Sequence, residues 1–452
     1  MSALPFAIIG YAVALIALGL WVSRRVRESS DFFVGGRSLS TGLLFSTFLA
    51  ANIGYGSTVG AAGHAYTDGF AAWWWNGSAG LGSLVLAFWV GPKIWAEAKR
   101  LGLLTVGDFL EHHFGRSVRV LAAALIWLGS LTILGAQIKG ASEVLHVSVG
   151  LPLAAGALGA SAVATAYFAF GGLLSAASVN RVQLVVILAG FLAAAPFAAG
   201  AVGGFGVALA DESSFWRGSH VGWPTLFLLG PAFFLSPGLI QKAFGARDER
   251  TLRRGVALNA VALLAFACLP MLIGLVARTL HPGLPRQDMA LPTVLAENVP
   301  SWVGALALAA ILSAELSSAD AVLFMLSTSG ARDFYKGLFR PAATDGEVLR
   351  MARILAVCGG AIGFLLTFVF DSVVSALTMF YSIMVVTLFT PILGGLYLPR
   401  GGRWGAVAAM LVGVATLFVT HLATGGAGYG WAAPHFLGLV AGTMAYVVLA
   451  VF

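Results

Sequence analysis

The chain has 452 residues, of which 59% are hydrophobic and 10% are charged, and its mean hydropathy is +0.91. This balance excludes a soluble globular protein and predicts an all-α polytopic membrane protein. Basic loops at a membrane surface explain the net charge of +7 without a nucleic-acid partner. The two cysteines lie in apolar segments, which argues against a disulfide framework and against a cysteine-ligated metal centre.

Apolar runs of about 20 residues predict thirteen membrane spans. The first lacks a basic start and a cleavage site, so we expect a retained helix rather than a signal peptide. With the N-terminus outside, 22 of the 26 Lys and Arg residues fall in cytoplasmic segments. The positive-inside rule therefore predicts a multi-pass protein of the cell membrane with a cytoplasmic C-terminus. The spans centre near Val13, Gly54, Leu84, Leu131, Ser161, Leu192, Phe234, Leu264, Ser317, Gly363, Val385, Val412 and Ala441.

Two spans are predicted to be interrupted. The second reads FSTFLAANIGYGSTVGAAG, with glycines at its middle that weaken a helix. The seventh carries Pro231 and Pro237, which kink or break helices. An unwound segment frees backbone groups that bind ions or solute at mid-membrane. For the second span, the alternative is a face of small residues used for helix packing.

Other polar and aromatic residues have simpler interpretations. The run Trp73–Trp75 opens the third span and predicts an interfacial aromatic belt, or else the roof of a binding cavity. Lys139 and Glu143 are four residues apart on one helix, so a structural ion pair is expected. His112 and His113 lie in an amphipathic inner segment and are expected to be solvated rather than metal-binding.

The ninth span, within Ala309–Tyr335, carries two carboxylates. At about 100° per residue, Asp320, Ser313, Ser317 and Ser318 share one face. Such a stripe of oxygens suits a small hard cation such as sodium. Serines in membrane helices also bond their own backbone or join two helices, so a packing role is the alternative for any single one.

Glu315 is the second carboxylate of this span. It projects about 160° from Ser317 around the helix, away from the stripe. We expect it to pair with a polar group on a neighbouring helix and to serve stability or a separate role.

Four stretches resemble the sodium:solute symporter family, which includes sodium/galactose, sodium/proline and sialic acid transporters. They are DFFVGGRSL, TVGDFLEHHFG, LIQKAFGAR and SSADAVLFMLSTSGARDFYK. The resemblance implies the leucine-transporter fold, with two inverted repeats of five helices, one extra N-terminal helix and two extra C-terminal helices. It divides one transporter domain, 1–452, into an N-terminal helix and inner loop (1–39), a first repeat (40–204), a second repeat (222–398) and the C-terminal helices (403–452).

The resemblance also implies a principal sodium site. Its ligands would be the backbone carbonyls of Ala50, Ile53 and Ala314 and the hydroxyls of Ser317 and Ser318.

A second ion site, present in some members, uses an aspartate on the sixth span, where this chain has Asn180. Asp320 on the ninth span would supply the missing anion from across the same cavity. Either a second cation or a proton would bind there. The alternative is a plain hydrogen bond between Asp320 and Asn180 with no ion, because buried carboxylates often take up a proton instead of a metal.

The resemblance and the interrupted helices suggest a set of solute-binding residues. Two of them, Ser57 and Asn76, stand where the galactose transporter holds its sugar, and neither has the longer amide or carboxylate expected there. We therefore favour a small amino acid or organic acid over a sugar. The set is Gly56, Ser57, Trp75, Asn76, Gln137, Phe233 and Tyr381.

The predicted function is secondary active transport, in which sodium, the coupling ion, drives symport of a small polar solute. We expect neither an enzyme nor an organic cofactor, because no catalytic constellation occurs. Two alternatives remain: a membrane sensor of the same fold that signals through a separate partner, and a proton-coupled symporter. The sequence leaves the solute and the oligomeric state open.

Overall fold

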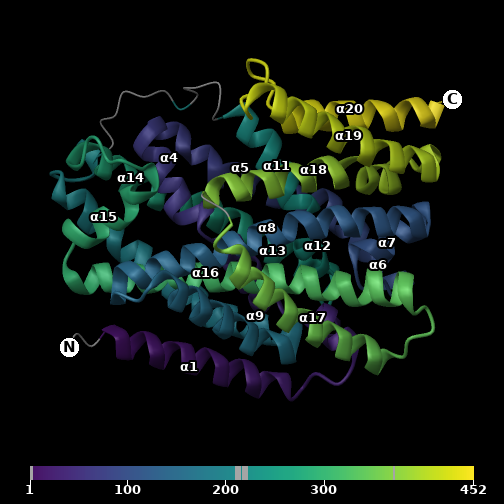
Figure 1. Ribbon diagram of the computed structural model, residues 1–452, viewed down its shortest axis with the longest axis horizontal. Coiled ribbons are helices and arrows are strands. Elements are labelled where there is room, and N and C mark those ends of the chain that lie inside the picture. The colour runs from purple at the N-terminus through teal and green to yellow at the C-terminus, as the bar shows by residue number, and fades with distance from the viewer. Residues whose placement is uncertain (1–3, 209–214, 216–221, 370–371, 452) are drawn as a thin grey trace.

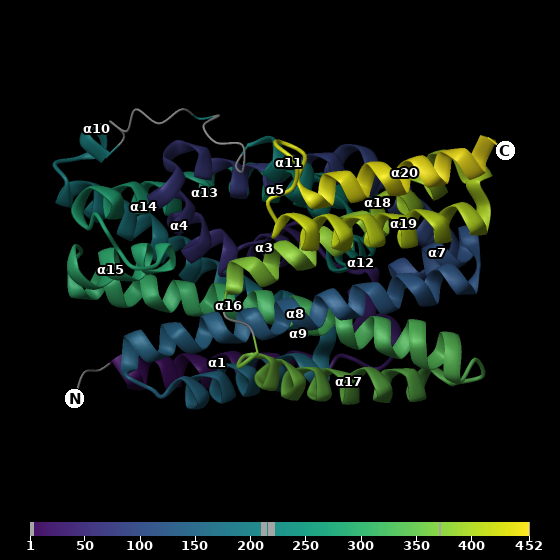
Figure 2. The same ribbon diagram turned by 45° about the horizontal axis from the view of Figure 1, so that its top comes forward.

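The computed structural model describes the chain except residues 1–3, 209–214, 216–221, 370–371 and 452. Its elements are helices, most of which run along the long axis of the molecule (Figure 1). Within the described residues, ten helices are long and apolar enough to cross a membrane. The N- and C-termini lie at opposite ends of the bundle in both ribbon views (Figure 2).

The first half of the chain contains the first of the two interrupted spans. Its helices are α1 (Leu4–Ser23), α2 (Ser29–Val34), η1 (Gly35–Arg37), α3 (Thr41–Asn52), η2 (Gly56–Gly60), α4 (Ala61–Asp68), η3 (Gly69–Ala72), α5 (Trp73–Val85), η4 (Leu86–Val90), α6 (Gly91–Leu101), α7 (Val106–Phe114), α8 (Arg116–Val149), α9 (Leu153–Ala201) and α10 (Phe205–Ala208).

The second half contains the other interrupted span and the polar ninth span. Its helices are α11 (Trp223–Leu235), α12 (Pro237–Phe244), α13 (Glu249–Phe266), α14 (Cys268–Leu280), η5 (Gln287–Met289), α15 (Ala290–Glu297), α16 (Ser301–Ser329), η6 (Gly330–Phe339), α17 (Asp345–Leu366), α18 (Val373–Tyr397), η7 (Pro399–Gly401), α19 (Gly402–Thr424) and α20 (Pro434–Val451).

The predicted spans correspond to these helices, so the all-helical membrane fold is confirmed. Each predicted centre lies inside a helix except Gly54, which lies in the gap between α3 and η2. The fifth and sixth spans are joined in α9, which bends at Gly172. That glycine has a φ of +51°, and a Cβ there would lie 2.5 Å from the Phe32 ring. Only glycine meets both conditions without strain.

Helix α16 is the centre of the bundle and is flanked by helices from both halves of the chain. It crosses the middle of Figure 1, and it packs extensively against α9 and α8. Helices α1 and α17 cover one side, and α19 and α20 cover the other. Because protein surrounds the middle of α16, Ser313, Ser317, Ser318 and the two carboxylates are almost completely shielded from solvent and lipid.

Candidate functional site

The second span is interrupted where its glycines predict. Helix α3 ends at Asn52, Ile53 is extended (φ −101°, ψ 98°), and regular structure resumes at Gly56. The interruption leaves backbone carbonyls of the last turn without helical partners. Those carbonyls face α16, which brings the two predicted halves of the sodium site together.

Two serines of α16 contact this interrupted end. Ser317 Oγ donates to the carbonyl of Ala50 at 2.8 Å and to that of Ala314 at 3.0 Å. Ser318 Oγ donates to the carbonyls of Ala51 at 3.3 Å and Ile53 at 3.4 Å. The five residues that the resemblance assigns to sodium therefore form one cluster of oxygens between α3 and α16. Neutral hydroxyl and carbonyl oxygens of this kind replace the water shell of a small cation.

Gly54 allows this close approach. A Cβ at Gly54 would lie 2.4 Å from Ser318 Oγ and 3.1 Å from Gln137 Nε2. Any larger residue would push α16 and α8 away from the interrupted segment.

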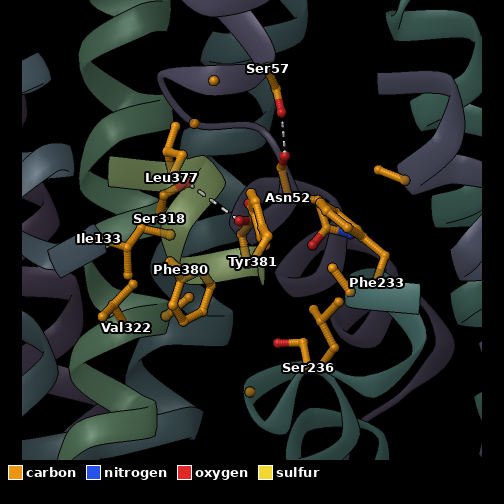
Figure 3. A pocket seen from close by; sticks show the side chains of 18 of the residues that line it. Asn52, Ser57, Ile133, Phe233, Ser236, Ser318, Val322, Leu377, Phe380 and Tyr381 are labelled. Atoms are coloured by element: carbon orange, nitrogen blue, oxygen red, sulfur yellow. Dashed lines mark hydrogen bonds between the residues drawn. The ribbon is translucent and has the colours of Figure 1, made fainter. Parts of the chain in front are cut away.

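The seventh span is also broken, as its prolines predict. Helix α11 ends at Leu235, Ser236 has non-helical angles (φ −52°, ψ 122°), and α12 begins at Pro237. The two interrupted spans border one cavity with about 60 Å³ of free space. Figure 3 shows residues of both, among them Asn52 and Ser236, lining this cavity.

All seven residues predicted to bind solute line this one cavity. Asn76 Nδ2 donates to the Ser57 carbonyl at 2.9 Å, and Ser57 Oγ donates to the Asn52 carbonyl at 2.8 Å. The Phe233 and Tyr381 rings pack with their centroids 5.9 Å apart (Figure 3). Amide and hydroxyl groups thus share the wall with aromatic rings, as in many small-molecule sites.

Lys242 is the charged residue that our sequence reasoning missed on this wall. It is one of the 22 basic residues expected in cytoplasmic segments, but in the structure it lies within α12 and not in an exposed loop. Its side chain is 1% exposed and donates from Nζ to the Thr47 carbonyl at 3.1 Å. Its position near the end of an apolar span resembles that of an interfacial lysine. Only the packing of α12 against α3 and α16 buries it.

Asp320 and Asn180 meet between α16 and α9, as predicted. With its amide nitrogen toward the carboxylate, Asn180 donates to Asp320 Oδ2 at 2.9 Å and accepts from Thr47 Oγ1 at 3.2 Å. Tyr167 also donates to Oδ2, at 2.9 Å. Oδ1 has no hydrogen-bond partner among the described residues, and the charge of Lys242 acts on this carboxylate. Asp320 therefore has the predicted hydrogen bond to Asn180 and also one carboxylate oxygen, Oδ1, without a hydrogen-bond partner among the described residues.

Four simpler expectations need correction. Trp74 and Trp75 are buried, and Trp75 lines the solute cavity, so Trp73–Trp75 is not a plain interfacial belt. His113 is not fully solvated, because its Nε2 lies 2.7 Å from Glu97 Oε1. Ser313 belongs to the packing of α16, since its hydroxyl bonds Tyr11 at 2.8 Å.

Glu315 is the fourth correction. Neither of its carboxylate oxygens has a hydrogen bond among the described residues, although a polar partner was expected. The side chain faces Gly140 on α8, where a Cβ would lie 3.1 Å from Glu315 Oε2, and the backbone of Tyr55 is the polar group that acts on it.

Three comparisons with known proteins match this architecture. The chain is 24% identical over 423 residues to the high-affinity proline transporter PutP of Bacillus subtilis, covering 90% of this chain and 89% of that protein. It is 28% identical over 452 residues to the human high affinity choline transporter 1, covering 90% and 75%. Its fold matches a Na⁺-coupled sialic acid symporter with a TM-score of 0.85 at 17% identity, covering 100% of this chain and 98% of that one.

The match to the sialic acid symporter establishes the leucine-transporter-like fold independently of sequence. A family model matches residues 32–413, which include both interrupted spans and the whole of α16. This protein is therefore a transporter rather than an enzyme, and it belongs to the sodium:solute symporter family.

Proposed function

We propose that this protein is a symporter that uses the inward movement of sodium to take up a small polar solute with an anionic group. The observation that carries the proposal is the cluster of five oxygen-bearing residues where α3 is interrupted beside α16. The cluster directly adjoins the solute cavity, because Ser318 belongs to both.

The cluster suggests how binding of the two ligands is coupled. Sodium held by the Ala50 and Ile53 carbonyls and the two hydroxyls would join α3 to α16. This would hold the interrupted segment in place and thereby order Gly56 and Ser57 on the cavity wall. Coupling between linked sites is typically about 1–3 kcal/mol. Rocking of one helix bundle against the other would then open the opposite side.

The wall of the cavity favours an acidic solute over a sugar or a simple cation. Asn52, Asn76 and Gln137 supply amides to the cavity wall, and Lys242 supplies a positive charge. The relatives named for proline and choline differ in solute chemistry, so their names alone do not decide the solute. Aromatic walls would also suit a quaternary ammonium group, but Lys242 opposes a cation.

We also propose the repeat boundaries and the membrane orientation that the sequence predicts. Each repeat, 40–204 and 222–398, begins with an interrupted span. The distribution of basic residues among the loops supports an N-terminus outside and a C-terminus in the cytoplasm.

A thermal-shift screen tests the function. The purified protein is heated with small carboxylates, amino acids, sugars and choline, each with and without sodium. We expect a carboxylate to stabilise the protein only when sodium is present. Sodium-driven accumulation of that solute in proteoliposomes must follow. Binding without accumulation would instead support the sensor alternative, and stabilisation by choline alone would contradict the acidic solute.

A further inference from the structure

A groove at the end of the bundle that carries the C-terminus belongs to neither the proposed sodium site nor the solute cavity. It lies where the start of α8, the end of η6 and the start of α19 meet, and its free space is about 650 Å³. Both ribbon views show α7, which leads into α8, at this same end (Figures 1 and 2). The lining of the groove combines two arginines with apolar side chains and includes no acid.

The two arginines of the groove, Arg116 on α8 and Arg403 on α19, are not used in salt bridges with other described residues. Arg116 donates one hydrogen bond, from Nη2 to the Leu338 carbonyl at 2.8 Å. Glu111, the acid on the adjoining helix α7, is paired with Arg119 instead. The groove therefore offers two positive charges to an anion.

The start of α8 supplies further hydrogen-bond donors to the groove. The first amides of a helix have no intrahelical partner, and the N-cap residue Gly115 has no side chain with which to cap them. Ser117 also lines the groove, and its Oγ is a buried atom without a hydrogen-bond partner among the described residues. Guanidinium groups, free amides and an unpaired hydroxyl are donors that suit phosphate oxygens.

The apolar side of the groove indicates that the ligand has hydrocarbon chains. Leu121 and Ala124 continue the groove along α8, and Leu128, one turn further, is 56% exposed. With 34 residues, α8 is about 51 Å long, whereas the hydrocarbon core of a bilayer is about 30 Å thick. Its start can therefore reach the lipid headgroups. The exposed Trp404 ring, 5.0 Å from the Arg403 guanidinium, is typical of that interface.

We infer that this groove binds an anionic phospholipid, with its phosphate between Arg116 and Arg403 and its acyl chains along Leu121 and Ala124. A free phosphate ion would leave the apolar side of the groove empty. The proposed orientation places this end at the cytoplasmic leaflet, whose anionic lipids attract basic segments. The bound lipid joins α8, η6 and α19, which are far apart in the sequence. Lipid binding does not depend on the proposed symport function.

Thermal unfolding of the purified, delipidated protein tests the choice of ligand. The protein is titrated with short-chain phosphatidylglycerol and, in parallel, with short-chain phosphatidylcholine, glycerol 3-phosphate and inorganic phosphate. We expect saturable stabilisation by phosphatidylglycerol at concentrations where the other three have little effect. An equal effect of phosphatidylcholine would show that no anionic headgroup is selected. Saturation by inorganic phosphate in the same range would assign the groove to a free anion, and either result would overturn the inference.

A double variant, Arg116→Gln with Arg403→Gln, tests the position of the site. An arginine near an anionic lipid surface typically contributes about fivefold in affinity, so this variant should bind phosphatidylglycerol about 25-fold more weakly. Arg24→Gln with Arg25→Gln is the matched control, because it removes two charges just after α1, where Arg25 lies 5.1 Å from the Trp21 ring centroid. The control should bind the lipid as wild type does. Equal lipid affinity of the two double variants would contradict the inference.

A third variant, Ala124→Trp, tests the apolar side and leaves both arginines in place. Ala124 is exposed, so the larger ring should fill the groove without disturbing the core. We expect the loss of most of the stabilisation by phosphatidylglycerol, while Ala124→Ser keeps it. Without lipid, all these variants should unfold near the wild-type temperature. Unchanged lipid affinity in Ala124→Trp would show that the acyl chains do not lie in this groove.

Discussion

Two buried charged clusters of this protein differ in how completely their polar groups are paired. The first surrounds Arg119, where α7, α8 and η6 meet. Arg119 donates to Asp333 at 3.0 Å and to the Arg332 carbonyl at 2.8 Å, and it pairs with Asp108 at 2.9 Å and with Glu111.

The acids of this first cluster have further partners. Asp333 accepts from Thr105 and Ser329, each at 2.8 Å, and Asp108 pairs with Arg332 at 3.2 Å. The two buried acids of this cluster, Asp108 and Asp333, are thus each paired with an arginine and have further hydrogen bonds. The cluster joins α7, α8 and η6 and therefore stabilises the fold.

The second cluster, around Asp320, is incomplete. Asp320 Oδ1 and Gln183 Nε2 lack partners among the described residues, and the three-donor ammonium of Lys242 makes one hydrogen bond. Unsatisfied buried groups reduce stability, so proteins keep them mainly where a ligand or a proton completes them. The comparison indicates that unpaired groups, rather than buried charge alone, mark the functional region.

The largest effect should come from breaking the complete cluster. Arg119→Met would leave Asp333 buried without a cation and would remove one of the two arginines that pair with Asp108, at a cost of about 3–5 kcal/mol. We expect little folded protein in size-exclusion and thermal-unfolding measurements. Arg116→Met is the control, because exposed Arg116 makes one bond to the Leu338 carbonyl. Equal thermal stability of the two variants would show that the Arg119 cluster does not stabilise the fold.

The second largest effect is expected at the proposed sodium site, where the oxygens of the hydroxyls and carbonyls are neutral. Replacing Ser317 and Ser318 together by Ala should leave the fold intact and abolish stabilisation by sodium. For a single site, that stabilisation amounts to about 2.7 kcal/mol at a sodium concentration one hundred times Kd. Thermal unfolding against sodium concentration measures it. If the double variant retained normal sodium affinity, the assignment of this site would be wrong.

A smaller effect is expected when Asp320, at the centre of the incomplete cluster, is replaced. If a second sodium completes Asp320, the Hill coefficient of uptake for sodium exceeds one, and Asp320→Asn lowers it to one. A tenfold loss of apparent affinity would correspond to about 1.4 kcal/mol.

Adding Asn180→Asp to the Asp320→Asn variant should partly restore a Hill coefficient above one for sodium, because it returns a carboxylate to the space between α9 and α16. A change in pH dependence alone would identify a proton instead. If neither response changed, Asp320 would serve only helix packing.

The smallest effect should follow Tyr167→Phe. The hydroxyl of Tyr167 donates to Asp320 and lies 3.0 Å from the Leu316 carbonyl. Its loss removes hydrogen bonding worth about 1 kcal/mol but no charge. Unfolding should occur at slightly lower temperature, while the Hill coefficient for sodium stays as in wild type. A large change in sodium response would mean that Tyr167 belongs to the ion site.

Local chemistry determined much of the fold from sequence alone. Span length and hydropathy are properties of single helices, so the thirteen centres were predictable without tertiary information. The breaks near Gly54 and at Ser236 were also predictable, since glycine and proline act on their own backbone. The shared face of Ser317, Ser318 and Asp320 follows from helix geometry.

The solute-binding set required more than local chemistry. Residues from α5, α8, α11 and α18 meet at one cavity, and the family resemblance together with the interrupted helices brought them together in advance.

The tertiary structure alone decided the surroundings of the buried charges. Lys242 looks like a loop lysine in sequence, yet packing places it beside Asp320 and the solute cavity. Glu315 looks like a residue with a polar partner, yet Gly140 and Tyr55 face it instead. Whether a buried charge is paired depends on atoms that are distant in sequence, and helix periodicity carries no information about them.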